Sequence, residues 1–279
     1  PGMDQDQLQD LGGLRVDGRR PLELRRIRVR LGVFRQADGS AYLEQGQTKI
    51  LATVYGPHQP RGAAARSTAN KSAKGIINCQ YSMAVFSFTA GERKKRPRGD
   101  RKSQDRCVQL RHAMEAVLNL DQFPRSQIDI FIEVLQVDGS DYCASVNAAT
   151  LALIDAGIPI KDYAIGCTIT LPDSSTSYDE QDARGIGVLD ANFMEECGPG
   201  VTLSIVALPE TNNDASKESG LIVVAQGSGQ RLHLSRLEGM KVRALCGCRD
   251  IKVILDRAVR QHLTANSLPS LFNVHSLVD

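Results

Sequence analysis

Residues 138–142, Asp-Gly-Ser-Asp-Tyr, form the first segment of this sequence whose residue types could carry chemistry. They separate a strand-like run from a helix-like run, and Gly139 and Ser140 suit a turn that holds an anion. Free backbone N–H groups and the positive end of the helix dipole converge at such a turn. Asp141, however, falls at the N-cap or first-turn position, where a carboxylate caps the helix and takes the anion's place. Both interpretations stay open, and the self-capped helix is favoured over a working phosphate site.

A basic run between residues 93 and 102 is the second candidate. It carries a charge of +6, whereas the whole chain carries only +2. Closely spaced cations displace counterions from nucleic-acid phosphates, and Pro97 and Gly99 favour a loop over a regular helix. No aromatic residue interleaves the run to stack on bases. A phosphate-binding surface is favoured over a merely solvated loop. The cations are Arg93, Lys94, Lys95, Arg96, Arg98, Arg101 and Lys102.

Asp190, Glu195 and Glu196 are the third candidate. Converging carboxylates can hold Mg²⁺ or act as an acid and base pair. Acids beside loops are more often surface residues, so the pattern alone is weak. The five histidines share no ligand or triad spacing, and the seven scattered cysteines indicate free thiols in a reducing compartment.

The scaffold for these candidates is predicted from periodicity. Residues 128–137 alternate with apolar residues on both faces, which predicts a strand in the middle of a covered sheet. A helix is predicted from Cys143 until Gly157 and Pro159 stop it. With 279 residues, 42% of them hydrophobic, the chain can bury a real core. No apolar run approaches the 18 or so residues of a membrane span.

The remaining pattern predicts an α+β (α/β) fold in which helices cover mixed sheets. Residues 1–13 are expected to form a flexible leader, 14–263 a single domain, and 264–279 a tail. Polar inserts are expected at 58–75, 172–187 and 209–220. Further strands are expected at 23–34, 41–44, 48–55, 76–88, 164–171, 201–208 and 221–226, and further helices at 101–120 and 234–263.

Several motifs, in one order along the chain, resemble the RNase PH family from about Leu14 to His262. Among members of that family, the sequence is most similar to ring subunits of the RNA exosome, and within these to the subunit whose archaeal and plant relatives are phosphorolytic. The most specific motifs lie at residues 15–20, 37–46, 55–57, 79–82, 91–94, 99–103, 124–130 and 147–159.

The resemblance implies the RNase PH-like fold, six such subunits in a ring, and RNA threading the pore. Active family members use inorganic phosphate to attack the last 3′ phosphodiester and release a nucleoside diphosphate. They hold the phosphate with an arginine, here matched by Arg101, and with a Gly-Thr-Arg or Gly-Ser-Arg turn. Two acids stand near the scissile bond with Mg²⁺, and Asp190 matches the first of them.

This sequence departs from that pattern at three positions. Asp141 replaces the hydroxyl residue of the turn, Tyr142 replaces its arginine, and Glu196 replaces the second aspartate. The resemblance therefore implies a non-catalytic ring subunit that needs no cofactor. One alternative is an active phosphate-dependent 3′–5′ exoribonuclease that uses Arg101, Asp190 and Glu196, with Mg²⁺. A third class is a stand-alone RNA-binding protein.

The same resemblance implies the partners. They are other RNase PH-like ring subunits, cap subunits with RNA-binding domains, a hydrolytic nuclease subunit, and RNA, with no membrane. Residues 61–75 align with the pore-neck loop of relatives. The expected work is rRNA processing and mRNA decay in the nucleus, nucleolus and cytoplasm. Cations expected to add to the RNA path are Arg61, Arg66, Lys71 and Lys74.

Overall fold

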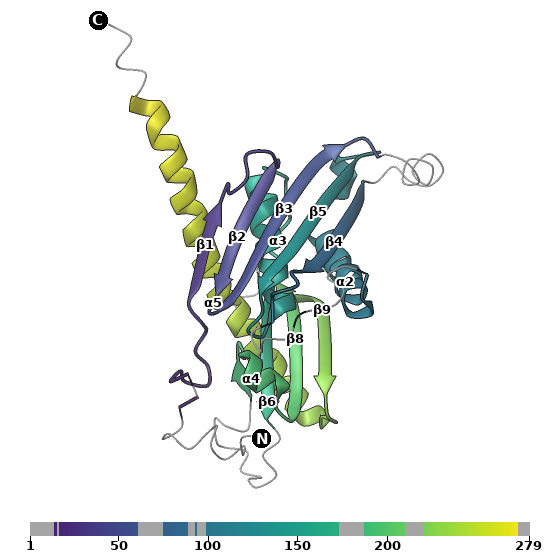
Figure 1. The fold of residues 1–279 in the computed structure, drawn as a ribbon, viewed down its shortest axis with the longest axis vertical. Coiled ribbons are helices and arrows are strands. Elements are labelled where there is room, and N and C mark those ends of the chain that lie inside the picture. The colour runs from purple at the N-terminus through teal and green to yellow at the C-terminus, as the bar shows by residue number, and fades with distance from the viewer. Residues whose placement is uncertain are drawn as a thin grey trace, which may run out of the picture.

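Two β-sheets and the helices packed against them make up the fold (Figure 1). The computed structural model describes residues 14–15, 17–60, 75–88, 93, 99–172, 187–209 and 220–272, with side chains to residue 265. The first sheet has the order β1-β2-β3-β5-β4 and is antiparallel except for the parallel pair β4 and β5. Its strands are β1 (Ile27–Leu31), β2 (Gly39–Gln45), β3 (Thr48–His58), β4 (Ile76–Met83) and β5 (Gln127–Gln136).

The second sheet has four antiparallel strands in the order β7-β6-β8-β9. They are β6 (Ile165–Pro172), β7 (Val188–Leu189), β8 (Gly200–Leu208) and β9 (Leu221–Gly229). The helices are α2 (Arg101–Val117), η2 (Leu120–Gln122), α3 (Asp141–Asp155), α4 (Phe193–Cys197) and α5 (Leu234–Phe272). Helices on mixed sheets confirm the expected α+β architecture.

Helix α3 lies between the two sheets and contacts strands of both. Every residue from Tyr142 to Leu153 is buried, so this helix has no solvent face. Its small residues let the neighbouring backbones come close. A Cβ at Gly166 of β6 would stand 2.7 Å from the Cα of Cys143, which explains why glycine is needed there.

Strand β5 is covered less completely than its sequence predicts. Ile128, Ile130, Ile132 and Val134 point into the core and are at most 1% exposed. The alternate residues, including Phe131 and Leu135, are only half-buried. The prediction that both faces are covered is therefore wrong for this chain, because its helices pack against one face of the first sheet.

The parallel pair β4 and β5 is joined through α2, which packs on β4. A parallel crossover must return along the sheet, so α2 begins where β4 ends. Helix α3 begins where β5 ends, at the same edge. This edge, called the carboxyl edge below, is where open sheets of this kind place their ligands.

Several boundaries differ from the predicted ones. The strand expected over 76–88 ends at Met83, and the helix expected over 234–263 continues to Phe272. Residues 1–13, 273–279 and most of the three polar inserts lie outside the described residues. All seven cysteines are free, as expected. Among the described residues no helix has the length and apolarity needed to cross a membrane.

Candidate active site

The turn that connects β5 to α3 has an unusual backbone. Gly139 and Ser140 both have positive φ, at 76° and 53°. A Cβ at Gly139 would lie 2.5 Å from the carbonyl oxygen of Ala191, so only glycine fits. Ser140 is the N-cap of α3, but its side chain forms no capping hydrogen bond. The backbone N–H groups at the start of α3 are thus not satisfied by the serine itself.

A carboxylate from another element occupies this helix terminus. The Ser140 backbone N–H donates to Oε2 of Glu196 at 3.0 Å. Glu196 lies on α4, in a position where burial and the charge of Asp141 raise its pKa, although Ser140, Arg106 and Arg25 act in the opposite direction. Burial is the larger cause of the raised pKa, and electrostatic repulsion between the Glu196 and Asp141 carboxylates adds to it. The Glu196 carboxyl group therefore lies at the amino end of α3, where a bound anion would otherwise accept this hydrogen bond.

Asp141 lies in the first turn of α3, as expected, but it does not cap the helix. Its Oδ2 accepts a 2.8 Å hydrogen bond from the hydroxyl of Tyr81, and its Oδ1 lies 3.5 Å from Nη2 of Arg106. Burial and the charge of Asp141 raise the pKa of Tyr81 well above its ordinary value, so this hydroxyl stays a donor. The favoured prediction of a self-capped helix is wrong, because Asp141 turns toward α2 and β4 instead.

Arg106 joins three elements around Tyr142. It comes from α2, and its guanidinium carbon lies 5.0 Å from the centre of the Tyr142 ring, within cation–π range. Its Nη1 donates to Oε1 of Gln226 on β9 at 3.0 Å. Tyr142, which stands where active relatives carry an arginine, is 1% exposed. The positive charge that α2 brings to this site is thus already engaged by protein groups.

Asp190 does not face an open site. Its carboxylate accepts hydrogen bonds from the backbone N–H of Arg25 at 2.9 Å, from Nη2 of Arg25 at 2.8 Å and from Nε2 of Gln45 at 2.9 Å. The residue is fully buried. Burial alone would raise its pKa, but the charge and hydrogen bonds of Arg25 outweigh burial and lower it. The interpretation of Asp190 as a vestigial catalytic acid stays a prediction, and the structure adds that its side chain belongs to a buried ion pair with Arg25.

The Arg25 side chain also reaches the turn. It donates to the carbonyl oxygens of Asp138 and Gly139. Asp190, Arg25 and the turn therefore form one connected unit. Glu195, beside Glu196, has a structural role as well, because it forms an ion pair with Arg15 and a capping box with Asn192 at the start of α4.

The predicted cations are only partly described. Arg93, Arg101 and Lys102 are all exposed. Lys102 and Glu196 shift the pKa of the Cys197 thiol in opposite directions, so the start of α2 lies beside α4. The other predicted cations lie outside the described residues: Arg61, Arg66, Lys71, Lys74, Lys94, Lys95, Arg96 and Arg98.

Sequence reasoning missed Arg106, Tyr81, Arg25 and Gln45. For Arg106 a signal existed, because it stands four residues before the buried Leu110 on the stripe of α2 that faces the core. A charged residue on such a stripe needs a buried partner. Arg25 and Gln45 carried no such signal, since their partner Asp190 is far away in sequence.

Fold and site together define a member of the RNase PH family of 3′ exoribonucleases, and the chain belongs to that family. Residues 23–159 match the family described as "3' exoribonuclease family, domain 1". The human protein named Exosome complex component RRP41 is 46% identical over 256 residues, which cover 92% of this chain and 94% of that protein. Its Arabidopsis thaliana homolog is 41% identical over 198 residues, which cover 71% of this chain and 75% of the plant protein.

Solved structures share the fold at lower identity. Rice Rrp46 superposes with a TM-score of 0.70 at 21% identity, covering 88% of this chain and 100% of that one. A chain of the Archaeoglobus fulgidus exosome with RNA bound to the active site gives a TM-score of 0.66 at 19% identity, covering 88% of this chain and 95% of that one. These likenesses confirm the expected RNase PH-like fold.

Proposed function

We propose that this chain is a ring subunit of an RNA exosome that scaffolds the ring and threads RNA, and that it does not catalyse phosphorolysis. One observation carries the proposal: the place for phosphate at the amino end of α3 is held by the carboxylate of Glu196, with Asp141 beside it. The relatives named RRP41 support the assembly, because the chain matches them over nearly its whole length.

Electrostatic repulsion at the turn supports the proposal that phosphate does not bind there. Loss of one preorganised donor to a developing charge costs roughly 10²–10³ in rate. A carboxylate at about 4 Å from a phosphate dianion adds repulsion on the order of 1–4 kcal/mol per unit charge. Arg106 does not compensate, because Asp141, Gln226 and the Tyr142 ring already engage its guanidinium. Together these effects remove about four orders of magnitude of rate.

The acids present do not fit the magnesium site of an active relative. Asp190, the first of the two matching acids, accepts three hydrogen bonds from Arg25 and Gln45 and has no exposed surface. Within the described residues, no three acidic, histidine or cysteine side chains are grouped to hold a metal. Glu196 and Asp141, at the turn, are held by Ser140, Tyr81 and Arg106. Asp138, in the turn itself, accepts a 3.3 Å hydrogen bond from the Phe193 N–H.

The proposed partners follow from the assembly. They are other RNase PH-like ring subunits, cap subunits with RNA-binding domains, a hydrolytic nuclease subunit that degrades the threaded RNA, and RNA itself. The proposed sites of action are the nucleus, nucleolus and cytoplasm, in rRNA processing and mRNA decay. The exposed cations at the start of α2, Arg101 and Lys102, support an RNA path along the carboxyl edge.

Phosphorolysis remains the second candidate function, favoured by one observation. Arg101, which matches the phosphate-binding arginine of active relatives, is exposed at the start of α2, and no ion pair joins it to another described residue. The test is an assembled ring incubated with 3′-labelled RNA, inorganic phosphate and Mg²⁺. We expect no nucleoside diphosphate, and RNA decay only after a hydrolytic nuclease subunit is added.

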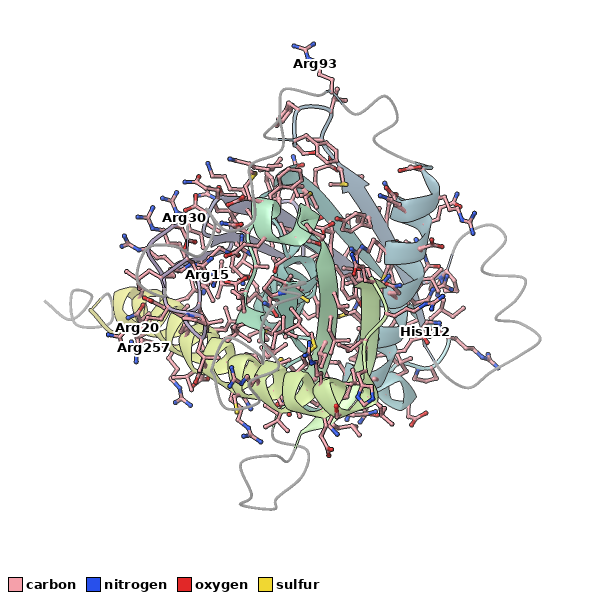
Figure 2. The ribbon with its side chains drawn as sticks, turned by 90° about the horizontal axis from the view of Figure 1, so that it is seen from below. Arg15, Arg20, Arg30, Arg93, His112 and Arg257 are labelled. Carbon is pink, nitrogen blue, oxygen red and sulfur yellow. The ribbon has the colours of Figure 1, made fainter. Side chains whose placement is uncertain are left out.

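Diphosphate release that disappears in both Arg101→Gln and Glu196→Gln would overturn the non-catalytic assignment. Arg257→Gln is the matched control, because Arg257 is an exposed arginine of α5 (labelled in Figure 2), a helix that does not contribute to the turn. A chain that stays monomeric with every ring partner would instead favour the stand-alone RNA-binding protein.

A further inference from the structure

The carboxyl edge bears an exposed aromatic side chain that the site described above does not use. Phe86 is 71% exposed and its neighbour Val85 is 41% exposed. Both follow β4, which ends at Met83. The sequence pattern predicted that this segment continues as a strand, and it predicted no aromatic platform near the basic run.

The backbone around Phe86 is held firmly, so its exposure is imposed by the fold. The Ser87 N–H donates to the Ala84 carbonyl at 3.0 Å, which closes the turn. The Ala84 N–H donates to the Val134 carbonyl, and the Val137 N–H donates to the Ser87 carbonyl, each at 2.9 Å. Ser87 is fully buried, whereas Phe86 points away from the core. The bond between Val137 and Ser87 also places the segment that carries Phe86 beside Val137, which directly precedes the 138–142 turn.

Cations share this edge with Phe86. Arg101 and Lys102 begin α2 at the end of β4, and the ion pair of Arg106 with Asp141 ties the same part of α2 to the turn. Arg93 is exposed and projects from the side of the molecule opposite α5 (Figure 2). The fold thus brings an exposed aromatic ring, which follows β4, and the exposed cations at the start of α2 to the same edge of the sheet.

We propose that Phe86 is a stacking platform for an unpaired base of single-stranded RNA whose phosphates contact Arg93, Arg101 and Lys102. This combination of an aromatic face and a positively charged groove is how proteins bind single strands without sequence preference, because every base has a π-face. The proposal rests on the proposed RNA-threading function and adds a specific subsite to it. The proposal also implies that the RNA does not contact residues 138–142, since the carboxylates of Glu196 and Asp141 would repel its phosphates there.

The experiment uses the assembled ring and two probes of equal length, oligouridylate and an abasic ribose-phosphate oligomer. Dissociation constants are measured by fluorescence anisotropy at several salt concentrations. We expect Phe86→Ala to weaken oligouridylate binding by roughly 5- to 100-fold, the range of one lost base–aromatic stack. The abasic probe has no base to stack, so its binding is expected to stay unchanged.

The salt dependence separates stacking from charge. Phe86→Ala removes no cation, so the slope of log K against log salt concentration is expected to match that of the unmodified ring. Phe86→Trp keeps a stacking surface and is expected to retain affinity. Leu234→Ala serves as the matched control, because Leu234 is an equally exposed hydrophobic residue (78%) at the start of α5.

Each contrary result has a distinct meaning. An unmodified ring that binds neither probe refutes the proposed function together with the subsite. Unchanged oligouridylate binding in Phe86→Ala overturns the subsite alone. Loss of ring assembly in Phe86→Ala, seen by mass in solution, would show that Phe86 contacts a neighbouring subunit instead, and this too overturns the subsite.

Discussion

The backbone N–H of Ser140 donates a 3.0 Å hydrogen bond to the Glu196 carboxylate, so the amino end of α3 already holds an anion. This bond links two segments that lie 56 residues apart in the sequence. It satisfies a helix terminus whose N-cap side chain does not cap it. A side chain of α4 thus supplies the acceptor for the backbone N–H group at the N-cap of α3.

The first prediction concerns Glu196 and pH. Because the folded state raises its pKa, the proton is held more tightly in the folded chain than in the unfolded chain. Its stabilising contribution is thus complete at low pH and is lost as pH rises through the folded pKa. Glu196→Gln removes the buried charge and keeps an oxygen for the Ser140 N–H. We expect it to raise the free energy of unfolding at pH 7 by roughly 1 kcal/mol.

Urea unfolding at pH 7 and pH 4 measures this effect. The gain is expected to shrink between pH 7 and pH 4, because the wild-type Glu196, whose pKa is raised, takes up a proton as the pH falls. Glu238→Gln, at an exposed position on α5, is the control and should not reproduce the pH dependence. A Glu196→Gln variant that is less stable at pH 7 would contradict the repulsion between Glu196 and Asp141.

The second prediction separates a structural from a catalytic role for Asp190. Asp190→Asn leaves the guanidinium of Arg25 buried without its charged partner, a change that typically costs about 3–5 kcal/mol of stability. The folded state lowers the pKa of Asp190, so its contribution is present above the unfolded pKa and is lost as pH falls through the folded one. The variant is therefore expected to be less sensitive to acid than the wild type.

Thermal and urea unfolding from pH 2 to pH 7 test this expectation. Asp256→Asn is the matched control, because Asp256 pairs with Arg260 at 2.7 Å on the exposed side of α5 and should leave stability close to that of the wild type. An Asp190→Asn variant as stable as the wild type would show that the buried pair of Asp190 with Arg25 does not stabilise the fold.

Local sequence was sufficient to predict the elements that hold the site. The strand expected over 128–137 is β5, Gln127–Gln136, and the helix expected from Cys143 begins at Asp141. Periodicity is a property of neighbouring residues, so it carries this information without knowledge of the fold. It also placed the polar turn between them correctly.

Side-chain pairs between residues far apart in the sequence could not be predicted from local periodicity. Arg25 and Asp190 are 165 residues apart, and nothing in either neighbourhood specifies the other. The expected cap at Asp141 failed for the same reason, because Tyr81 and Arg106 reach it from β4 and α2. The resemblance to active relatives identified the acids but could not show that one of them is buried.

The third prediction tests whether Arg106 and Asp141 act as a pair. Arg106→Met removes the cation and leaves the half-buried Asp141 without its ion-pair partner, and we expect a loss of roughly 1–3 kcal/mol of stability. Asp141→Ser alone should be destabilising as well, since Arg106 then lacks its carboxylate. If the two interact, the double variant loses less than the sum of the single variants, by about 0.5–3 kcal/mol.

A double-mutant cycle by urea unfolding measures this coupling. Arg111→Met, at an exposed position of the same helix, is the control and should show no coupling to Asp141→Ser. If the stability losses of Arg106→Met and Asp141→Ser simply add in the double variant, the 3.5 Å contact between the two side chains contributes nothing to the free energy of unfolding.

The fourth prediction concerns the cations at the start of α2. Arg101→Gln with Lys102→Gln removes two exposed positive charges from the carboxyl edge. For single-stranded nucleic acid each phosphate contact contributes about 0.7 to the slope of log K against log salt concentration. The slope for oligouridylate bound to the assembled ring is therefore expected to fall by about 1.4, together with the affinity. Arg257→Gln with Arg260→Gln removes two exposed charges from α5 and should leave the slope unchanged. An equal fall in both variants would mean that RNA is attracted by the overall charge of the chain and does not follow the carboxyl edge.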